Sequence, residues 1–462
     1  MATPKAVISA VKAKSTLKRA DKSSRPCARS SIEKLPSEIL IKILSYLDVA
    51  ALFTLSHVNS LFYQLASDNA LWHKIFLKEF GKKRKLYPKF VEDLLKKTAD
   101  ISNLDVGHWK WLYFKTGADC DTYKWKKSRY VINRHTGLPS KTEQVLRNLH
   151  VSWQLTVVER SQKQSTLDLS WLKFLETSVI LCWSGLLPDL HNISAVQLHG
   201  VRRVALSRTG LKKPAQRSLM MTLDMTVSKS TQHIGQDKLM QLKLLQPGVI
   251  VGLWKDQCSV AFVLLCLHFH RLVERSTQGS SVCPFIEPAA KPPFDDIDPE
   301  YGLHGYHLHI TLHNIKRTIL SESFASLFCH KSQMCDGLMQ LTAIHRNRLS
   351  EHTPLSGSIN LPWRCEALQG AVQNCCIMTV TLLDEFKIPL WYVSSAVSLE
   401  VDQSAHTDCN YEGNRFLIHF KDEVGQVKMH FVHDVEQETY TITGLVIYIT
   451  ISKINSHFGT NY

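Results

Sequence analysis

The sequence LPSEILIKILSYLDVAALFTLSHVNSLFYQLASDNALW, residues 35–72, has apolar residues at helical spacing along most of its length. Pro36 suits a first helical turn, where its missing N–H costs nothing, and Glu38 places negative charge at the positive end of the helix dipole. Asp48 and Asp68 are suited to cap later helices. The apolar positions of the first predicted helix are Ile39, Leu40, Ile43, Leu44 and Leu47. We therefore expect several short helices with tight connections, packed as a small bundle.

This bundle has more apolar side chains than its size can bury. A unit of about 40 residues rarely closes an independent hydrophobic core. The surplus indicates that a partner protein covers part of the apolar surface. The stretch therefore favours a binding adaptor before any catalytic motif is considered.

The order of apolar and capping residues in this bundle resembles the F-box family. The positions that fit the family pattern are Leu35, Pro36, Glu38, Ile39, Leu40, Ile43, Leu44, Leu47, Asp48, Val58, Leu71 and Trp72. The second half departs from the pattern, because Asn59, Ser60 and Phe62 stand where the family often has a basic residue and a Trp. The alternative is an ordinary bundle that begins with Leu-Pro, and the joint order of so many positions argues against it.

The resemblance implies a module that docks on the Skp adaptor of Skp–cullin–F-box ubiquitin ligases. It also implies which side chains do so. The expected docking residues are Leu35, Pro36, Ile39, Leu40, Ile43, Leu44, Leu47 and Val58, with Leu71 and Trp72 as late anchors. Some of these residues must instead fill the core of the bundle, and the sequence does not separate the two groups.

The rest of the chain is long enough for further domains. With 462 residues, 44% hydrophobic and 21% charged, it is expected to be globular and to form about two to four domains. We expect an α+β protein with four parts. These are a disordered basic tail (1–31), the F-box (32–80), a helical or irregular linker (81–148) and a large β-rich substrate-recognition domain (149–462).

From about residue 151 the apolar period changes from helical to alternating. Residues 416–420 and 427–431 alternate on either side of a turn at 422–425, which predicts a β-hairpin with one buried face. Further strands are expected at 151–158, 179–183, 249–254, 260–269, 306–312, 378–382 and 440–451. Many strands joined by short polar turns favour an antiparallel sandwich or barrel. No propeller or leucine-rich repeat is present in the sequence.

Segments of the β-rich part also resemble one particular member of the F-box family. They are residues 267–279 (LHFHRLVERSTQG), 298–309 (DPEYGLHGYHLH), 381–385 (TLLDE) and 452–462 (SKINSHFGTNY). The resemblance therefore reaches most of the chain. It implies a substrate receptor without identifying the residues that contact the substrate.

The formal net charge is +14, and part of it is local to the tail and to residues 82–85. Nucleic-acid binding is disfavoured, because charge alone gives sequence-independent affinity and no stacking motif or recognition helix accompanies it. Residues 82–85 have the character of a nuclear-import signal, so we expect a cytoplasmic and/or nuclear protein. No secretory signal or membrane span is expected, since the longest apolar run, 260–267, is far shorter than the roughly 20 residues that cross a bilayer.

Two His-x-His pairs, His268 with His270 and His307 with His309, suggest a metal site. Residues two apart on a strand point the same way, and His313 extends the second pair. A polar sheet face in water gives the same pattern and is the favoured interpretation. Structural zinc usually needs four ligands, and no Cys-x-x-Cys pair is present. We expect no metal and no cofactor.

No catalytic signature is found. The sequence has no glycine-rich dinucleotide or Walker loop, no Gly-x-Ser-x-Gly elbow and no His-Glu-x-x-His. The lack of Cys-x-x-Cys pairs argues against a RING domain. The 12 cysteines are expected to be reduced and buried, and Cys266, although near His268, to be an inert thiol.

Together these features predict a non-enzymatic substrate-recognition subunit. It would dock on the Skp adaptor and, through it, on the cullin and RING subunits, while the β-rich domain presents an unknown target protein. The alternative is a metal- or ligand-binding β domain, carbohydrate included, in which the F-box serves as a non-degradative scaffold.

Overall fold

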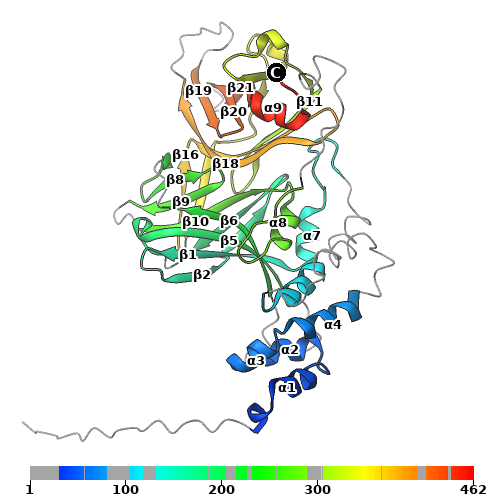
Figure 1. Ribbon diagram of the computed structural model, residues 1–462. Helices are drawn as coiled ribbons and strands as arrows, with labels where there is room; N and C mark the ends of the chain where they lie inside the picture. The colour runs from blue at the N-terminus through cyan, green and yellow to red at the C-terminus, as the bar shows by residue number, and fades with distance from the viewer. Residues whose placement is uncertain are drawn as a thin grey trace, which may run out of the picture. The chain divides into compact units, whose positions relative to one another are not determined.

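The structure is a computed structural model that describes residues 31–56, 58–80, 105–117, 132–185, 187–203, 215–225, 231–255, 259–288, 303, 305–365, 367–402, 411, 413–434 and 439–462. Contacts within the chain divide it into two units, Met1–Val106 and Gly107–Tyr462 (Figure 1). Apart from Ser31, the expected basic tail lies outside the described residues, as do residues 82–85 and most of the expected linker. The predicted α+β class is confirmed: short helices come first and antiparallel strands follow.

The first unit is a bundle of short helices. They are α1 (Ser37–Leu44), α2 (Val49–Leu55), α3 (Ser60–Leu65) and α4 (Asn69–Phe80), preceded by a 3₁₀ turn at Ser31–Lys34. The Asp48 carboxylate accepts the Ala51 N–H at 2.7 Å, so the predicted cap of the second helix is confirmed. Asn59 caps α3 by accepting the Phe62 N–H at 2.8 Å. The core contains Leu40, Leu44, Leu52, Phe62, Leu65 and Leu71.

In the second unit, the first two sheets along the chain form a β-sandwich. One sheet has the strand order β2-β1-β5-β6 and the other β3-β4-β10-β9-β8-β7. Their bounds are β1 Val151–Glu159, β2 Gln164–Asp168, β3 Trp171–Phe174, β4 Ser178–Ser184, β5 Ile193–Arg203, β6 Ala215–Asp224, β7 Gln232–Gln236, β8 Met240–Gln246, β9 Val249–Trp254 and β10 Val260–His268. Trp153 from the first sheet and Trp183 from the second lie in one buried apolar cluster. Two short helices, α7 (Thr142–Asn148) and α8 (Leu272–Thr277), pack beside the first sheet.

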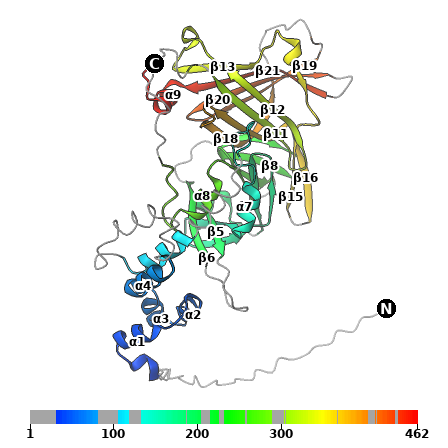
Figure 2. The same cartoon turned by 90° about the vertical axis from the view of Figure 1, so that its right-hand side faces the viewer.

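A larger antiparallel sheet follows and curls into a nearly closed barrel (Figure 2). Its order is β12-β11-β17-β18-β19-β20-β21-β13, with β14 paired to β21. The bounds are β11 Tyr306–His313, β12 Thr318–Leu327, β13 Leu338–Ile344, β14 Thr353–Pro354, β17 Cys375–Leu383, β18 Pro389–Val401, β19 Asn414–Lys421, β20 Gly425–Asp434 and β21 Thr439–Thr450. The predicted hairpin is confirmed as β19 and β20, in which Ile418 faces Met429. A last helix, α9 (Ile451–Phe458), places Phe458 edge-on against Tyr306.

A hairpin and two buried strands join the sandwich to the barrel. The hairpin, β15 (Asn360–Cys365) and β16 (Leu368–Gln373), contributes Trp363 and Val372 to a buried cluster that includes Leu264 and Ile377. Every residue of β10 and of β17 is buried, because each strand is covered on both faces. The prediction of a sandwich or a barrel is therefore met by one unit that contains both.

Candidate functional site

One face of α1 carries apolar side chains that the bundle leaves in contact with solvent. Leu35, Ile39 and Ile43 are 40%, 46% and 48% exposed. Ile39 and Ile43 lie four residues apart on one side of the helix, and Leu35 comes just before the helix begins at Ser37. On the other side, Leu40 and Leu44 are each 3% exposed and belong to the core. The helix therefore separates a core face from an uncovered face.

The remaining expected docking residues divide between surface and core. Pro36 and Val58 are exposed, and Leu47 is half-buried. Leu71 and Trp72 are buried, and the Trp72 indole N–H donates to the Ala66 carbonyl at 2.7 Å. The structure thus brings Leu35, Pro36, Ile39 and Ile43 together on the surface, whereas Leu40, Leu44, Leu71 and Trp72 lie inside.

Sequence reasoning missed two apolar residues that extend this face. Ile32 is 57% exposed one turn before Leu35, and Tyr46 is 81% exposed three residues after Ile43. Ile32 belongs to the 3₁₀ turn at Ser31–Lys34 and Tyr46 follows the helix end at Ser45, so the helical spacing of α1 does not extend to either residue. We call Ile32, Leu35, Ile39, Ile43 and Tyr46 the α1 apolar face.

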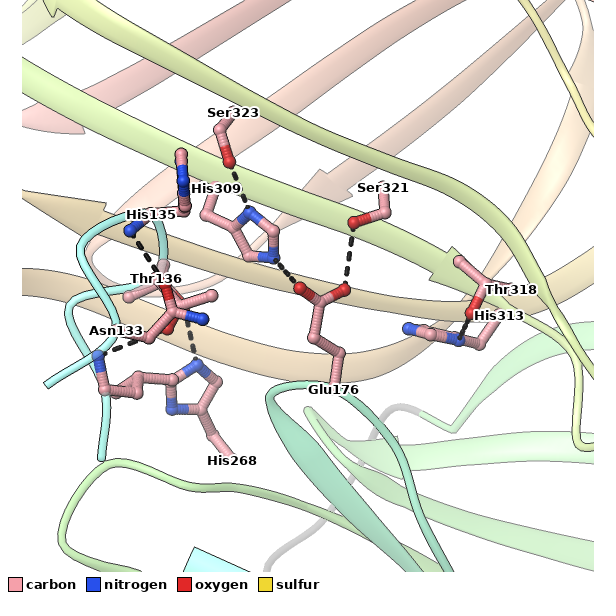
Figure 3. A network of polar contacts seen from close by, with 12 residues as sticks. Asn133, His135, Thr136, Glu176, His268, His309, His313, Thr318, Ser321 and Ser323 are labelled. Atoms are coloured by element: carbon pink, nitrogen blue, oxygen red, sulfur yellow. Dashed lines mark hydrogen bonds and ion pairs between the residues drawn. The ribbon is translucent and has the colours of Figure 1, made fainter. Parts of the chain in front are cut away.

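The second His-x-His segment lies in a buried polar interface, not on a solvated face as expected (Figure 3). His309 and His313 are 3% and 2% exposed, because this side of β11 packs against the sandwich. His309 Nδ1 lies 2.7 Å from Ser323 Oγ, and its Nε2 is 3.6 Å from a Glu176 carboxylate oxygen. The second Glu176 oxygen accepts the Ser321 hydroxyl at 2.9 Å. The expectation of a solvated face is therefore wrong, since neighbouring strands cover it.

The buried imidazoles act as neutral hydrogen-bonding groups. His268 Nε2 lies 2.9 Å from Thr381 Oγ1, and its Nδ1 accepts the His270 N–H at 3.0 Å. Burial lowers the pKa of His268 well below its ordinary value and that of His313 to about 4. In the part of the chain that the structure describes, no group of three or more His, Cys, Asp or Glu residues is placed to hold a metal ion.

The Cys266 thiol is buried within β10, and burial raises its pKa. A thiol held in its protonated form is a poor nucleophile. The described cysteines, 182, 266, 283, 329, 335, 365, 375 and 376, are all free thiols.

Comparison with known proteins identifies the family of the helical unit. Residues 32–78 match the F-box-like family. Over 437 residues the chain is 36% identical to F-box only protein 15 of Macaca fascicularis, covering 93% of this chain and 100% of that protein. The chain belongs to the F-box only protein 15 family. The human relative is 35% identical over 448 residues, which cover 95% of this chain and 88% of the human protein. The mouse relative is 32% identical over 436 residues, which cover 92% of this chain and 100% of the mouse protein.

Membership of the F-box only protein 15 family extends through the β unit as well as the F-box. The resemblance to this family member, indicated by residues 267–279, 298–309, 381–385 and 452–462, is therefore confirmed for 93% of the chain as a whole. F-box proteins are in general non-catalytic adaptors. Among the described helices, none is long and apolar enough to cross a membrane.

Proposed function

We propose that this member of the F-box only protein 15 family is the substrate-recognition subunit of a Skp–cullin–F-box ubiquitin ligase. Its α1 apolar face docks on the Skp adaptor, which links it to the cullin and RING subunits. Its β unit presents a target protein. The chain acts in the cytoplasm and/or the nucleus.

The observation that carries this proposal is the exposure of the α1 apolar face. The core of the bundle is already filled by Leu40 and Leu44 from the same helix, so the outer residues have no partner within the described bundle core. Burying the exposed halves of Leu35, Ile39 and Ile43 against a partner would contribute on the order of 3 kcal/mol. Exposed apolar patches of this kind mark protein interaction sites.

No catalytic group is required of the chain in this role. A target held beside a ubiquitin-charged enzyme reacts as if in one molecule, because its lysines are kept at high effective concentration. The buried neutral histidines and protonated thiols described above then have structural roles only.

The test is to replace Ile39 and Ile43 with Glu and to measure co-purification of the Skp adaptor and the cullin. We expect at least a ten-fold loss of both, because two carboxylates cannot be buried in an apolar contact without a partner. The matched control replaces Leu349 and Leu368 with Glu, since these residues of the β unit are 52% and 49% exposed. Binding of the Skp adaptor at wild-type affinity by the Ile39→Glu, Ile43→Glu chain would contradict the proposal.

A further inference from the structure

A cleft of about 1110 Å³, open to solvent, lies where three distant segments of the β unit meet. They are the facing ends of β3 and β4, the turn between β11 and β12, and the β15–β16 hairpin. Cavities that hold drug-sized ligands are about 300–1000 Å³. This cleft is therefore large enough for a short segment of another protein.

The cleft is positively charged. Lys316, Arg317 and Arg364 line it and are exposed, and no Asp or Glu is among the described residues that line it. None of the three cations forms an ion pair with a described residue. The nearby Asp237 is already engaged, since its carboxylate accepts the Trp363 indole N–H at 2.6 Å and the Leu239 and Met240 backbone N–H groups. The three cations are therefore available to an anionic ligand.

Hydrogen bonds hold the walls of the cleft in place before any ligand binds. Asn314 is 4% exposed, and its side-chain Oδ1 accepts the backbone N–H groups of Lys316 and Arg317 at 2.9 and 2.8 Å. Its amide donates to Asn360 at 3.3 Å, which ties this turn to the hairpin. Trp363, 4% exposed, packs edge-on against Trp254 at 5.9 Å. A preformed site loses less conformational entropy on binding.

We propose that this cleft binds an acidic segment of the target protein, with its carboxylates or phosphates held by Lys316, Arg317 and Arg364. The inference rests on the proposed function and names the chemistry of the target. Guanidinium groups pair with carboxylate and phosphate through two parallel hydrogen bonds. A nucleic acid fits less well, because its binding rests on a basic stripe with many phosphate contacts and not on three cations in a concave site.

The experiment uses the full chain expressed with the Skp adaptor and three fluorescent nine-residue peptides. All share a Gly-Ser background and differ only in a central triplet of phosphoserine, glutamate or glutamine. A labelled single-stranded DNA of 20 nucleotides is the fourth probe. Binding is measured by fluorescence anisotropy for the wild-type chain, for Arg317→Gln with Arg364→Gln, and for a control with the same charge change, Lys141→Gln with Lys163→Gln. Both control lysines are exposed and lie outside the cleft.

We expect the phosphoserine peptide, the glutamate peptide or both to bind at least ten-fold more tightly than the glutamine peptide. The arginine variant should lose at least ten-fold in affinity, while the control and the thermal midpoints remain unchanged. Binding of phosphoserine alone would identify a phosphorylated target segment, and equal binding an acidic one. Equal affinity for all three peptides, an unaffected arginine variant, or tighter cleft-dependent binding of the DNA would overturn the inference. Skp co-purification, scored in the same preparations, reports separately on the proposed function.

Discussion

At the scale of single residues, Ile39 and Leu40 are neighbours on α1 with opposite surroundings. Leu40→Ala should lower the free energy of unfolding of the helical unit by about 2–5 kcal/mol, because it removes buried methyl groups and leaves a cavity. Ile39→Ala should change that free energy by less than about 0.5 kcal/mol, as surface substitutions usually do. It should nevertheless weaken Skp binding roughly ten-fold, as loss of an interface anchor does. Denaturation curves and adaptor titrations on both variants test this. Equal effects of the two substitutions on stability would contradict the assignment of faces.

The sequence predicted Ile39, Leu40, Ile43 and Leu44 in this helix but not their faces, and it was wrong for Leu47, because α1 ends at Leu44. Ile39 and Leu40 both fit an amphipathic period, as do Ile43 and Leu44. The position of α3 decides which residue of each pair is buried and which is exposed. Asn59 illustrates the opposite case. It departs from the family pattern, yet it caps α3 through its own side chain.

At the scale of elements, the polar side of β11 makes the stability of the β unit depend on pH. Burial lowers the pKa of His313 to about 4, although the Glu176 carboxylate opposes the shift. The unfolded chain, with a histidine pKa near 6.5, therefore binds this proton first as the pH falls. The contribution of His313 to the free energy of unfolding should therefore be constant above about pH 6.5. It should fall as the pH decreases from 6.5 to about 4.

Denaturant unfolding at pH 7.5 and pH 5 measures this dependence. His313→Gln should unfold with a smaller difference between the two pH values than the wild type, since glutamine has no proton to gain. The control is His419→Gln, at an exposed position of β19. An unchanged pH dependence in the His313 variant would show that folding does not lower the pKa of this imidazole.

Each strand that alternation or an apolar run predicted is present, but β5, β6, β12, β13 and β18 are among the strands that it missed, and it did not show what covers them. The predicted strand at 306–312 is β11, and its polar side was assigned to solvent because His309 and His313 are polar. His309 contacts Ser323 in the neighbouring strand β12, but Glu176, which lies beside it, comes from the segment between β3 and β4, more than a hundred residues earlier. The cleft was missed for the same reason, since Trp171, Arg317 and Arg364 meet only in the folded unit.

At the scale of the whole molecule, the two proposed surfaces lie on different units of the chain, the α1 apolar face on Met1–Val106 and the cleft on Gly107–Tyr462. Substitutions that share no partners are expected to act independently. Ile39→Glu with Ile43→Glu should abolish recruitment of the Skp adaptor and the cullin while the target remains bound. Arg317→Gln with Arg364→Gln should retain both ligase subunits and lose the target.

Affinity purification from cells under proteasome inhibition tests this independence, with ubiquitin-modified proteins quantified beside the ligase subunits. The docking variant should capture the same target proteins as the wild type but without added ubiquitin, because nothing holds them beside the charged enzyme. The cleft variant should capture the ligase subunits alone, and the chain that carries both pairs of substitutions should capture neither. If the cleft variant also lost the Skp adaptor, or if the docking variant lost its targets, the two surfaces would be coupled. The separation of adaptor binding from target recognition would then be wrong.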